Sequence, residues 1–145
     1  MLDLMITVAI GLIGGIAVGT QAPIAAAMSQ RVGGAASSVI VHAGGLVASL
    51  LLLFGRGGEG MSQWRELPWY MLGCGALGLV LYLTISHTMP KLGAVAAIAL
   101  IIIGQLVAGV VIDSLGAFGA VPKALDLTRL VGIGVLLLGA YLVIK

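Results

Sequence analysis

Long stretches without a charged residue dominate the chain, and hydrophobic side chains fill them all the way round rather than along one face. Four such runs cover residues 4–30, 32–55, 67–90 and 92–112, and a shorter one covers 130–144. An α-helix needs roughly 20 apolar residues to cross a bilayer, and each of the four long runs is sufficient. Helices that are apolar on every side are typical of membrane spans. The pattern therefore predicts an all-α integral membrane protein.

We predict five transmembrane helices, near residues 4–27, 37–55, 68–87, 92–112 and 127–144. The last one can start before Arg129, because a long cationic side chain near a helix end reaches the headgroups. A membrane β-barrel would instead show alternating units of about 10 residues. The longest connection, 113–126, is too short to form a domain, so we expect one transmembrane domain over residues 1–145.

Composition supports this class and excludes others. Hydrophobic residues make up 61% of the chain and charged residues 8%, with a mean hydropathy of +1.23, whereas an ordinary soluble domain is roughly 25% charged. The net charge of +2 comes from scattered residues, without the basic patch that nucleic acid requires. We expect membrane lipid, and no nucleic acid, as a partner.

The distribution of Lys and Arg gives almost no preferred orientation. Five crossings put the two termini on opposite sides of the membrane. The side with the N-terminus holds Arg56, Arg65, Lys123 and Arg129, and the other side holds Arg31, Lys91 and Lys145. Cytoplasmic loops normally carry the excess of Lys and Arg, so a difference of one residue lets the chain insert both ways.

Dual insertion would solve a problem of size. Five helices can barely enclose a substrate path, whereas two copies in opposite orientations would form a ten-helix inverted repeat, an arrangement common among secondary transporters. The charge distribution therefore favours an antiparallel homodimer. A parallel dimer and a subunit of a larger complex remain open.

The first span contains a polar amide and a helix breaker in "GTQAPIAAAM", residues 19–28. Pro23 lacks the N–H that would bond to the Gly19 carbonyl, so Gly19 and Pro23 are predicted to form a kink or hinge. A freed carbonyl is tolerated where protein or a water-lined cavity surrounds it. Gln21 can offer a donor and an acceptor to that cavity, or it can act as a hydrogen-bonding contact between helices.

Three further polar residues lie deep in predicted spans. His42 shares one face of the second span with Ser38; it could carry protons, bind a substrate or simply hydrogen-bond to a backbone carbonyl. Tyr82 could line a pore or pack with one hydrogen bond. Gln105 has the same two interpretations as Gln21. We predict that Gln21, His42, Tyr82 and Gln105 bind substrate around a central cavity.

Glycines are spaced for helix packing. Gly11 and Gly15 recur with Gly19 at intervals of four residues, and Gly132 and Gly139 lie on one side of the fifth span. Small residues at this spacing let two membrane helices approach closely.

Several chemistries lack the residues they need. No Asp, Glu, Lys or Arg lies in the central part of a span, so a carboxylate-based antiport of multidrug cations has no obvious carrier. The sequence contains no metal-ligand cluster, catalytic triad or phosphate-binding glycine loop. We therefore expect no catalytic residues, no metal, no cofactor and no enzymatic activity.

Taken together, the motifs resemble a known family. They are "GLIGGIAVGTQAPIAAAMSQRVG" at 11–33, "PWYMLGCGALGLVLYLTISHTMPKLG" at 68–93, "IIIGQLVAGVVID" at 101–113 and "RLVGIGVLLLGAYL" at 129–142. The arrangement resembles the short, five-helix branch of the drug/metabolite transporter superfamily, which is catalogued as of unknown function. The resemblance implies a single-repeat chain that pairs into a ten-helix transporter, with Gln21, Pro23 and Gln105 at matched motif positions.

The function expected from these observations is secondary transport of a small polar or weakly amphipathic solute by alternating access, in the inner membrane of a prokaryote. The resemblance also marks a departure, because family members usually carry a nonpolar or aromatic residue near His42. His42 is therefore a candidate for a role specific to this chain. The alternative function is a non-transporting membrane subunit of a larger complex, and a membrane enzyme ranks third.

Overall fold

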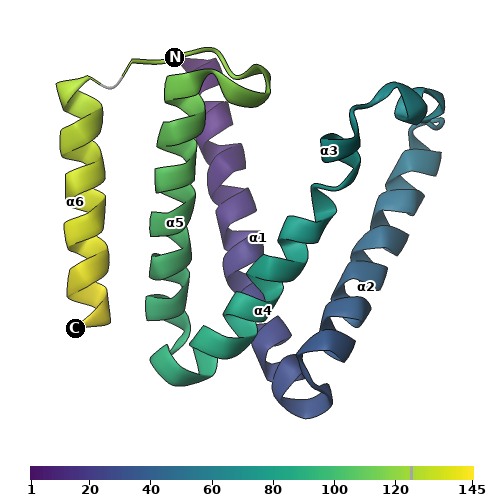
Figure 1. Ribbon diagram of the computed structural model, residues 1–145, viewed down its shortest axis with the longest axis horizontal. Helices are drawn as coiled ribbons and strands as arrows, with labels where there is room; N and C mark the ends of the chain where they lie inside the picture. The colour runs from purple at the N-terminus through teal and green to yellow at the C-terminus, as the bar shows by residue number, and fades with distance from the viewer. Residues whose placement is uncertain (125) are drawn as a thin grey trace. The chain divides into compact units, whose positions relative to one another are not determined.

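The computed structural model describes residues 1–124 and 126–145, and these residues contain helices and no strand (Figure 1). The elements are α1 (Leu2–Val32), α2 (Gly34–Gly55), η1 (Met61–Glu66), α3 (Trp69–Leu72), α4 (Gly75–Leu92), α5 (Ala94–Leu115), η2 (Ala117–Gly119) and α6 (Leu127–Ile144). Five helical stretches are long and apolar enough to cross a membrane, with Trp69–Leu92 counted as one. The all-α class with five spans is confirmed.

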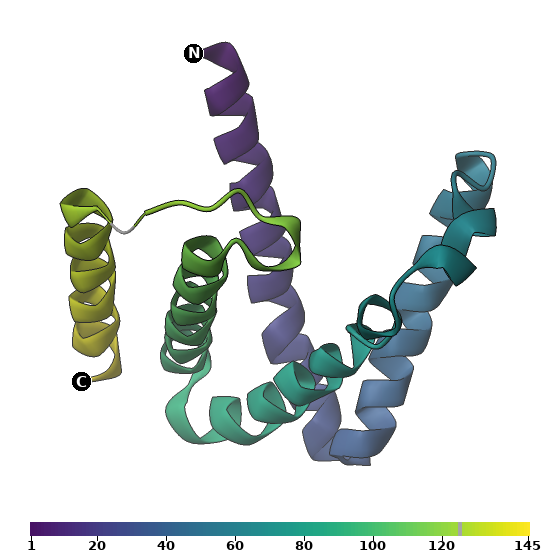
Figure 2. The ribbon, with the colours of Figure 1, turned by 45° about the horizontal axis from the view of Figure 1, so that its top comes forward.

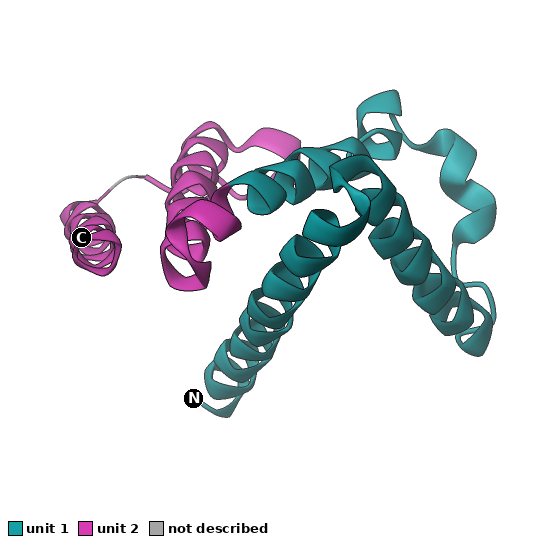
Figure 3. Cartoon of the chain, turned by 90° about the horizontal axis from the view of Figure 1, so that it is seen from below, with its two compact units in different colours: residues 1–87 teal, residues 88–145 magenta. Residues whose placement is uncertain are grey.

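The chain divides into two compact units, Met1–His87 and Thr88–Lys145 (Figure 3). The first unit contains α1, α2, α3 and most of α4. The second contains the last turn of α4 together with α5 and α6.

The connection between the first two spans is far shorter than predicted. We expected residues 28–36 to link the two helices, but α1 continues to Val32 and α2 begins at Gly34. The prediction ended the helix too early because Ser29, Gln30 and Arg31 are polar. In the structure these residues form the last turn of α1. Arg31 lies in that last turn, where a cation interacts favourably with the negative end of the helix dipole.

Gly33 alone joins α1 to α2. Its N–H donates to the Ser29 carbonyl at 2.9 Å, and its own carbonyl accepts from the Ser37 N–H at 3.1 Å. Its φ of 87° and ψ of 155° fall in a region that essentially only glycine adopts. The two helices diverge from this turn in both views (Figures 1 and 2). Gly93 joins α4 to α5 with nearly the same angles, 79° and 165°.

The third span is interrupted where we predicted a continuous helix over 68–87. A single turn, α3, ends at Leu72, and α4 begins at Gly75. Gly73 and Cys74 lie between them, and the Cys74 N–H donates to the Met71 carbonyl at 3.3 Å. Two glycines flanking one cysteine favour this break, because glycine has low helix propensity.

Pro23 does not end the first helix, since α1 is helical on both sides of it. The buried residues of α1 surround this position and are all small: Ala22, Ala25, Ala26 and Ser29. Small side chains allow a close approach of the other helices. Ser37 of α2 and Tyr82 of α4 are also buried, so the core of the first unit lies where these three helices meet.

In the second unit, α5 and α6 lie side by side and run antiparallel (Figures 1 and 2). An Arg129–Asp113 ion pair, 3.3 Å between Nη1 and Oδ2, joins the end of α5 to the start of α6. Asp126 caps α6, because its Oδ1 accepts a hydrogen bond from the Arg129 N–H at 2.8 Å. The helix begins at Leu127 as predicted.

Candidate functional site

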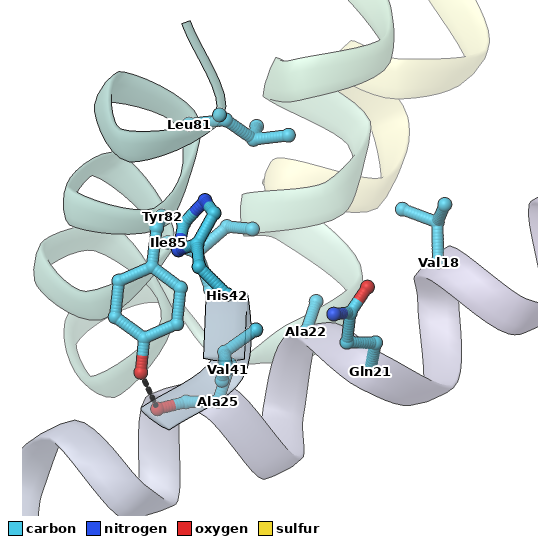
Figure 4. A pocket seen from close by; sticks show the side chains of 10 residues that line it. Val18, Gln21, Ala22, Ala25, Val41, His42, Leu81, Tyr82 and Ile85 are labelled. Carbon is cyan, nitrogen blue, oxygen red and sulfur yellow. Dashed lines mark hydrogen bonds between the residues drawn. The ribbon is translucent and has the colours of Figure 1, made fainter. Parts of the chain in front are cut away.

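A small pocket of about 190 Å³ lies between α1, α2 and α4, within the first unit (Figure 4). Its polar lining comes from Gln21 of α1, His42 of α2 and Tyr82 of α4. The other lining residues are apolar or small: Val18, Ala22, Ala25, Val41, Gly78, Leu81 and Ile85. Three of the four predicted substrate-binding residues, separated by up to 61 positions in the sequence, thus share one pocket.

Tyr82 ties α4 to both of the other helices. Its hydroxyl lies 2.9 Å from the Ala25 carbonyl oxygen and within hydrogen-bond distance of the Ser37 hydroxyl. A carbonyl only accepts, so the single phenol proton goes to Ala25, and the Ser37 hydroxyl can supply the second bond. Tyr82 is 5% exposed. The phenol therefore holds the helices together while its ring forms a wall of the pocket (Figure 4).

Contacts with Ser38 hold the imidazole of His42 at one of its two nitrogens, Nδ1. Nδ1 lies 2.7 Å from the Ser38 carbonyl oxygen and 3.2 Å from the Ser38 hydroxyl. Because the carbonyl has no proton to give, Nδ1 must carry the hydrogen. In the neutral ring Nε2 is then the acceptor.

Gly78 leaves the space that Nε2 occupies. A Cβ atom added at Gly78 would lie 3.2 Å from Nε2 of His42. Any larger residue at this position would press on the ring. Gly78 thus keeps the accepting side of His42 within the pocket.

Gln21 and His42 are both exposed in the single chain, although both lie in predicted spans. Polar groups facing lipid are costly because hydrocarbon offers them no hydrogen bonds. Such groups are better placed where water, a solute or another protein surface covers them.

No Asp, Glu, Lys or Arg lines the pocket, so its electrostatics depend on dipoles and on one imidazole. His42 and Tyr82 are its titratable residues, with ring centroids 6.4 Å apart and a tilt of 59°. Over the residues that the structure describes, His, Cys, Asp and Glu form no group of three or more able to hold a metal ion.

Gln105 lies on α5 in the second unit and is exposed. It lines neither the pocket of Gln21 nor an apolar groove of about 570 Å³ between α5 and α6. Its role in substrate binding stays a prediction, as do the roles of the other three residues and the hinge at Gly19 and Pro23.

The proposed packing glycines have open space around them among the residues that the structure describes. Apart from their chain neighbours and the backbone of their own helix, nothing lies within 4 Å of a Cβ placed on Gly11, Gly15, Gly132 or Gly139. Gly139 lines the groove between α5 and α6. Packing at these positions stays a prediction.

Sequence reasoning missed two groups that shape the pocket. Ser37 is fully buried and bonded to Tyr82, yet in the sequence it looks like part of a polar turn. The Ala25 carbonyl accepts a hydrogen bond from the Tyr82 hydroxyl. Every residue has a backbone carbonyl, so the sequence cannot indicate which one accepts such a bond. The position of Ser37, next to Ser38 near the start of the same span, was the sequence feature that could have indicated its role.

Comparison with known proteins gives one match. A family model described as "Putative inner membrane exporter, YdcZ", in the drug/metabolite transporter group, matches residues 6–142. No curated protein and no solved structure matches the chain.

Proposed function

The chain belongs to the YdcZ family of inner membrane exporters, and from this premise we propose that it is a secondary transporter working by alternating access. The proposed substrate is a small polar or weakly amphipathic solute. The proposed active form is a dual-topology homodimer in which two chains cross the membrane in opposite directions.

One observation carries the proposal: Gln21, His42 and Tyr82 come from three different helices and line one pocket. Binding sites are typically apolar cavities with a few polar groups that converge on the ligand. In transporters such sites form where helix geometry is disturbed within the span. Pro23 lies two residues from Gln21 and supplies such a disturbance.

The size and exposure of the pocket support a second chain. Pockets for drug-sized ligands usually measure about 300–1,000 Å³, and this one measures about 190 Å³. Gln21 and His42 are exposed beside it. A partner surface would enlarge the cavity and remove both polar side chains from lipid.

Topology is tested by fusing reporters after Lys145, one active only in the cytoplasm and one active only outside it. Comparable signals from both fusions are expected for dual insertion. A signal from one fusion alone would contradict the antiparallel homodimer. Adding Lys at Ser62 and Gln63, which are exposed in η1, should then shift the balance toward the outside reporter.

Transport is tested in proteoliposomes by efflux of a panel of radiolabelled small polar and weakly amphipathic solutes. Saturable efflux that falls in Gln21→Leu, but not in the matched Gln63→Leu, is expected. Gln63 is exposed in η1, outside the predicted spans. Absence of saturable flux for every solute would contradict the proposal.

A membrane subunit without transport activity is the alternative, and one observation favours it. The Tyr82 hydroxyl and the Nδ1 proton of His42 are both used in bonds within the chain, as expected for purely structural residues. Purification separates the two functions. A second protein that always copurifies, with no flux from the isolated chain, would support the subunit.

A further inference from the structure

We propose that Nε2 of His42 accepts either a proton or a hydrogen-bond donor of the substrate, but never both at once, and that this couples export to proton entry. The substrate class that fits is a small neutral solute with an N–H or O–H donor, such as an amide or an alcohol. The inference rests on the transport function proposed above and names its substrate class and coupling ion.

The first step is the fixed tautomer of His42. The 2.7 Å contact to the Ser38 carbonyl requires a hydrogen on Nδ1. The neutral ring therefore has one lone pair for hydrogen bonding, and it lies on Nε2. That nitrogen lies beside Gly78, where an added Cβ would come within 3.2 Å of it.

The second step is that the Tyr82 hydroxyl does not compete with Nε2 of His42 for the hydrogen-bond donor of the substrate. The phenol already bonds with Ala25 and Ser37, so its oxygen is turned away from His42 (Figure 4). The ring faces His42 at a tilt of 59°. Gln21 is the other polar group of the pocket, and its amide can both donate and accept.

The third step concerns charge. The groups facing His42 from α1 are Gln21 and apolar residues, and those from α4 are Gly78, Leu81, Tyr82 and Ile85. Tyr82 is the one titratable group among them, and α2 itself holds no Asp, Glu, Lys or Arg. No carboxylate lines the pocket to neutralise a cationic solute, and an uncompensated charge is costly inside a membrane once water is excluded. The imidazolium of His42 needs no such partner while its exposed side chain is open to water. A neutral solute is therefore preferred over a cation.

The exchange balances as a simple proton transfer. The imidazolium loses its Nε2 proton to water, the N–H bond breaks and its electron pair becomes the lone pair. The substrate donor then forms a hydrogen bond to that lone pair and keeps its own hydrogen. Reprotonation of Nε2 on the other side of the membrane releases the substrate. One proton entering for each neutral solute exported moves one positive charge inward, so the membrane potential assists export.

The tautomer is tested by nitrogen NMR on protein labelled at its two histidines, with His87→Gln to assign the signals. At about pH 8, above the range in which imidazole usually gains its charge, the His42 signal should show Nδ1 protonated and Nε2 bare. A proton on Nε2 in the neutral ring would overturn the inference without any ligand.

Competition is tested with benzamide, which has an N–H donor, and N,N-dimethylbenzamide, which has none. Benzamide should bind the purified protein more weakly as pH falls from about 8 to about 5, by up to about tenfold per pH unit where a proton competes for Nε2. Dimethylbenzamide should bind at least tenfold more weakly than benzamide at about pH 8. Equal affinity of the two, or no binding of benzamide at any pH, would overturn the substrate class.

The His42→Gln variant tests the proton coupling while keeping a hydrogen-bonding side chain at this position. A glutamine amide can place an acceptor near the Nε2 position but does not titrate, so benzamide affinity should become independent of pH. His87→Gln should keep the wild-type pH response. A wild-type response in His42→Gln would overturn the coupling.

Failure of the inference and failure of transport are distinguishable. Saturable efflux in proteoliposomes that ignores a pH gradient and survives His42→Gln unchanged would overturn the inference and leave the transporter intact. A bare Nε2 and pH-dependent benzamide binding, with no flux of any solute, would instead overturn the transport function.

Discussion

The Tyr82 hydroxyl lies 2.9 Å from the Ala25 carbonyl oxygen, so the third span is attached to the first just two residues beyond Pro23. The bond crosses 57 positions of sequence. It fixes one wall of the pocket at the part of α1 where a backbone N–H is missing.

Tyr82→Phe should destabilise the protein by about 0.6–2 kcal/mol, because it removes the hydroxyl bonded to Ala25 and Ser37. Titration with SDS in mixed micelles measures the shift in unfolding. Tyr141→Phe is the control, since Tyr141 is exposed on α6. A Tyr82→Phe protein as stable as the Tyr141→Phe protein would show that the bond contributes nothing.

Gly33→Ala should cost about 1–3 kcal/mol of stability, because a side chain strains the backbone at φ 87° and ψ 155°. Nothing lies within 4 Å of the added Cβ, so the cost comes from the backbone alone. Gly44→Ala on α2 also has open space but is helical and should be neutral or stabilising. The same unfolding titration compares them, and equal behaviour of the two variants would argue against the single-residue turn.

Gly78→Val should abolish most solute efflux, because its side chain would occupy the space beside Nε2 of His42. Gly75→Val, one turn earlier on α4, meets nothing within 4 Å and should retain efflux. Both are assayed in proteoliposomes at equal protein content. Equal efflux from the two variants would place the substrate elsewhere.

Leu at both Gly11 and Gly15 should dissociate the proposed dimer while leaving the chain folded. Apart from α1 itself, no described part of the chain lies within 4 Å of a Cβ at either position, so the larger side chains should chiefly disturb a partner. Light scattering of the detergent-purified protein reports the mass, with Gly44→Leu as the control. An unchanged dimer in the double variant would exclude this surface from the interface.

The spans were predictable because their driving force, apolar surface facing lipid, is spread over every residue of a run. Their ends were less so. Ser29 and Arg31 have the polarity of a loop, yet they complete α1 because Gly33 can turn the chain alone. The break at Gly73 and Cys74 depends on two glycines that could equally have been packing positions.

The polar residues that line the pocket could be predicted from the sequence, but the way in which they are arranged could not. Gln21, His42 and Tyr82 stood out as polar residues in apolar runs, and the structure brings them together. The tautomer of His42 was not predictable, because it depends on the distance to a backbone carbonyl. For Gln105 the sequence pattern alone was not enough. It is a polar residue in an apolar run, as Gln21 is, yet it lies in the other unit and lines neither cavity described above.

A single residue, Gly33, joins α1 to α2, so a rotation of α2 against α1 would have its pivot there. At 1.5 Å per residue, the 22 residues of α2 extend about 33 Å from that pivot, while His42 lies only about 13 Å from it. A swing of about 10° would then carry the far end of α2 through about 6 Å but shift His42 by only about 2 Å. The Nδ1 bond of His42 goes to Ser38 on the same helix, so a rotation of α2 about Gly33 would carry that bond along unchanged.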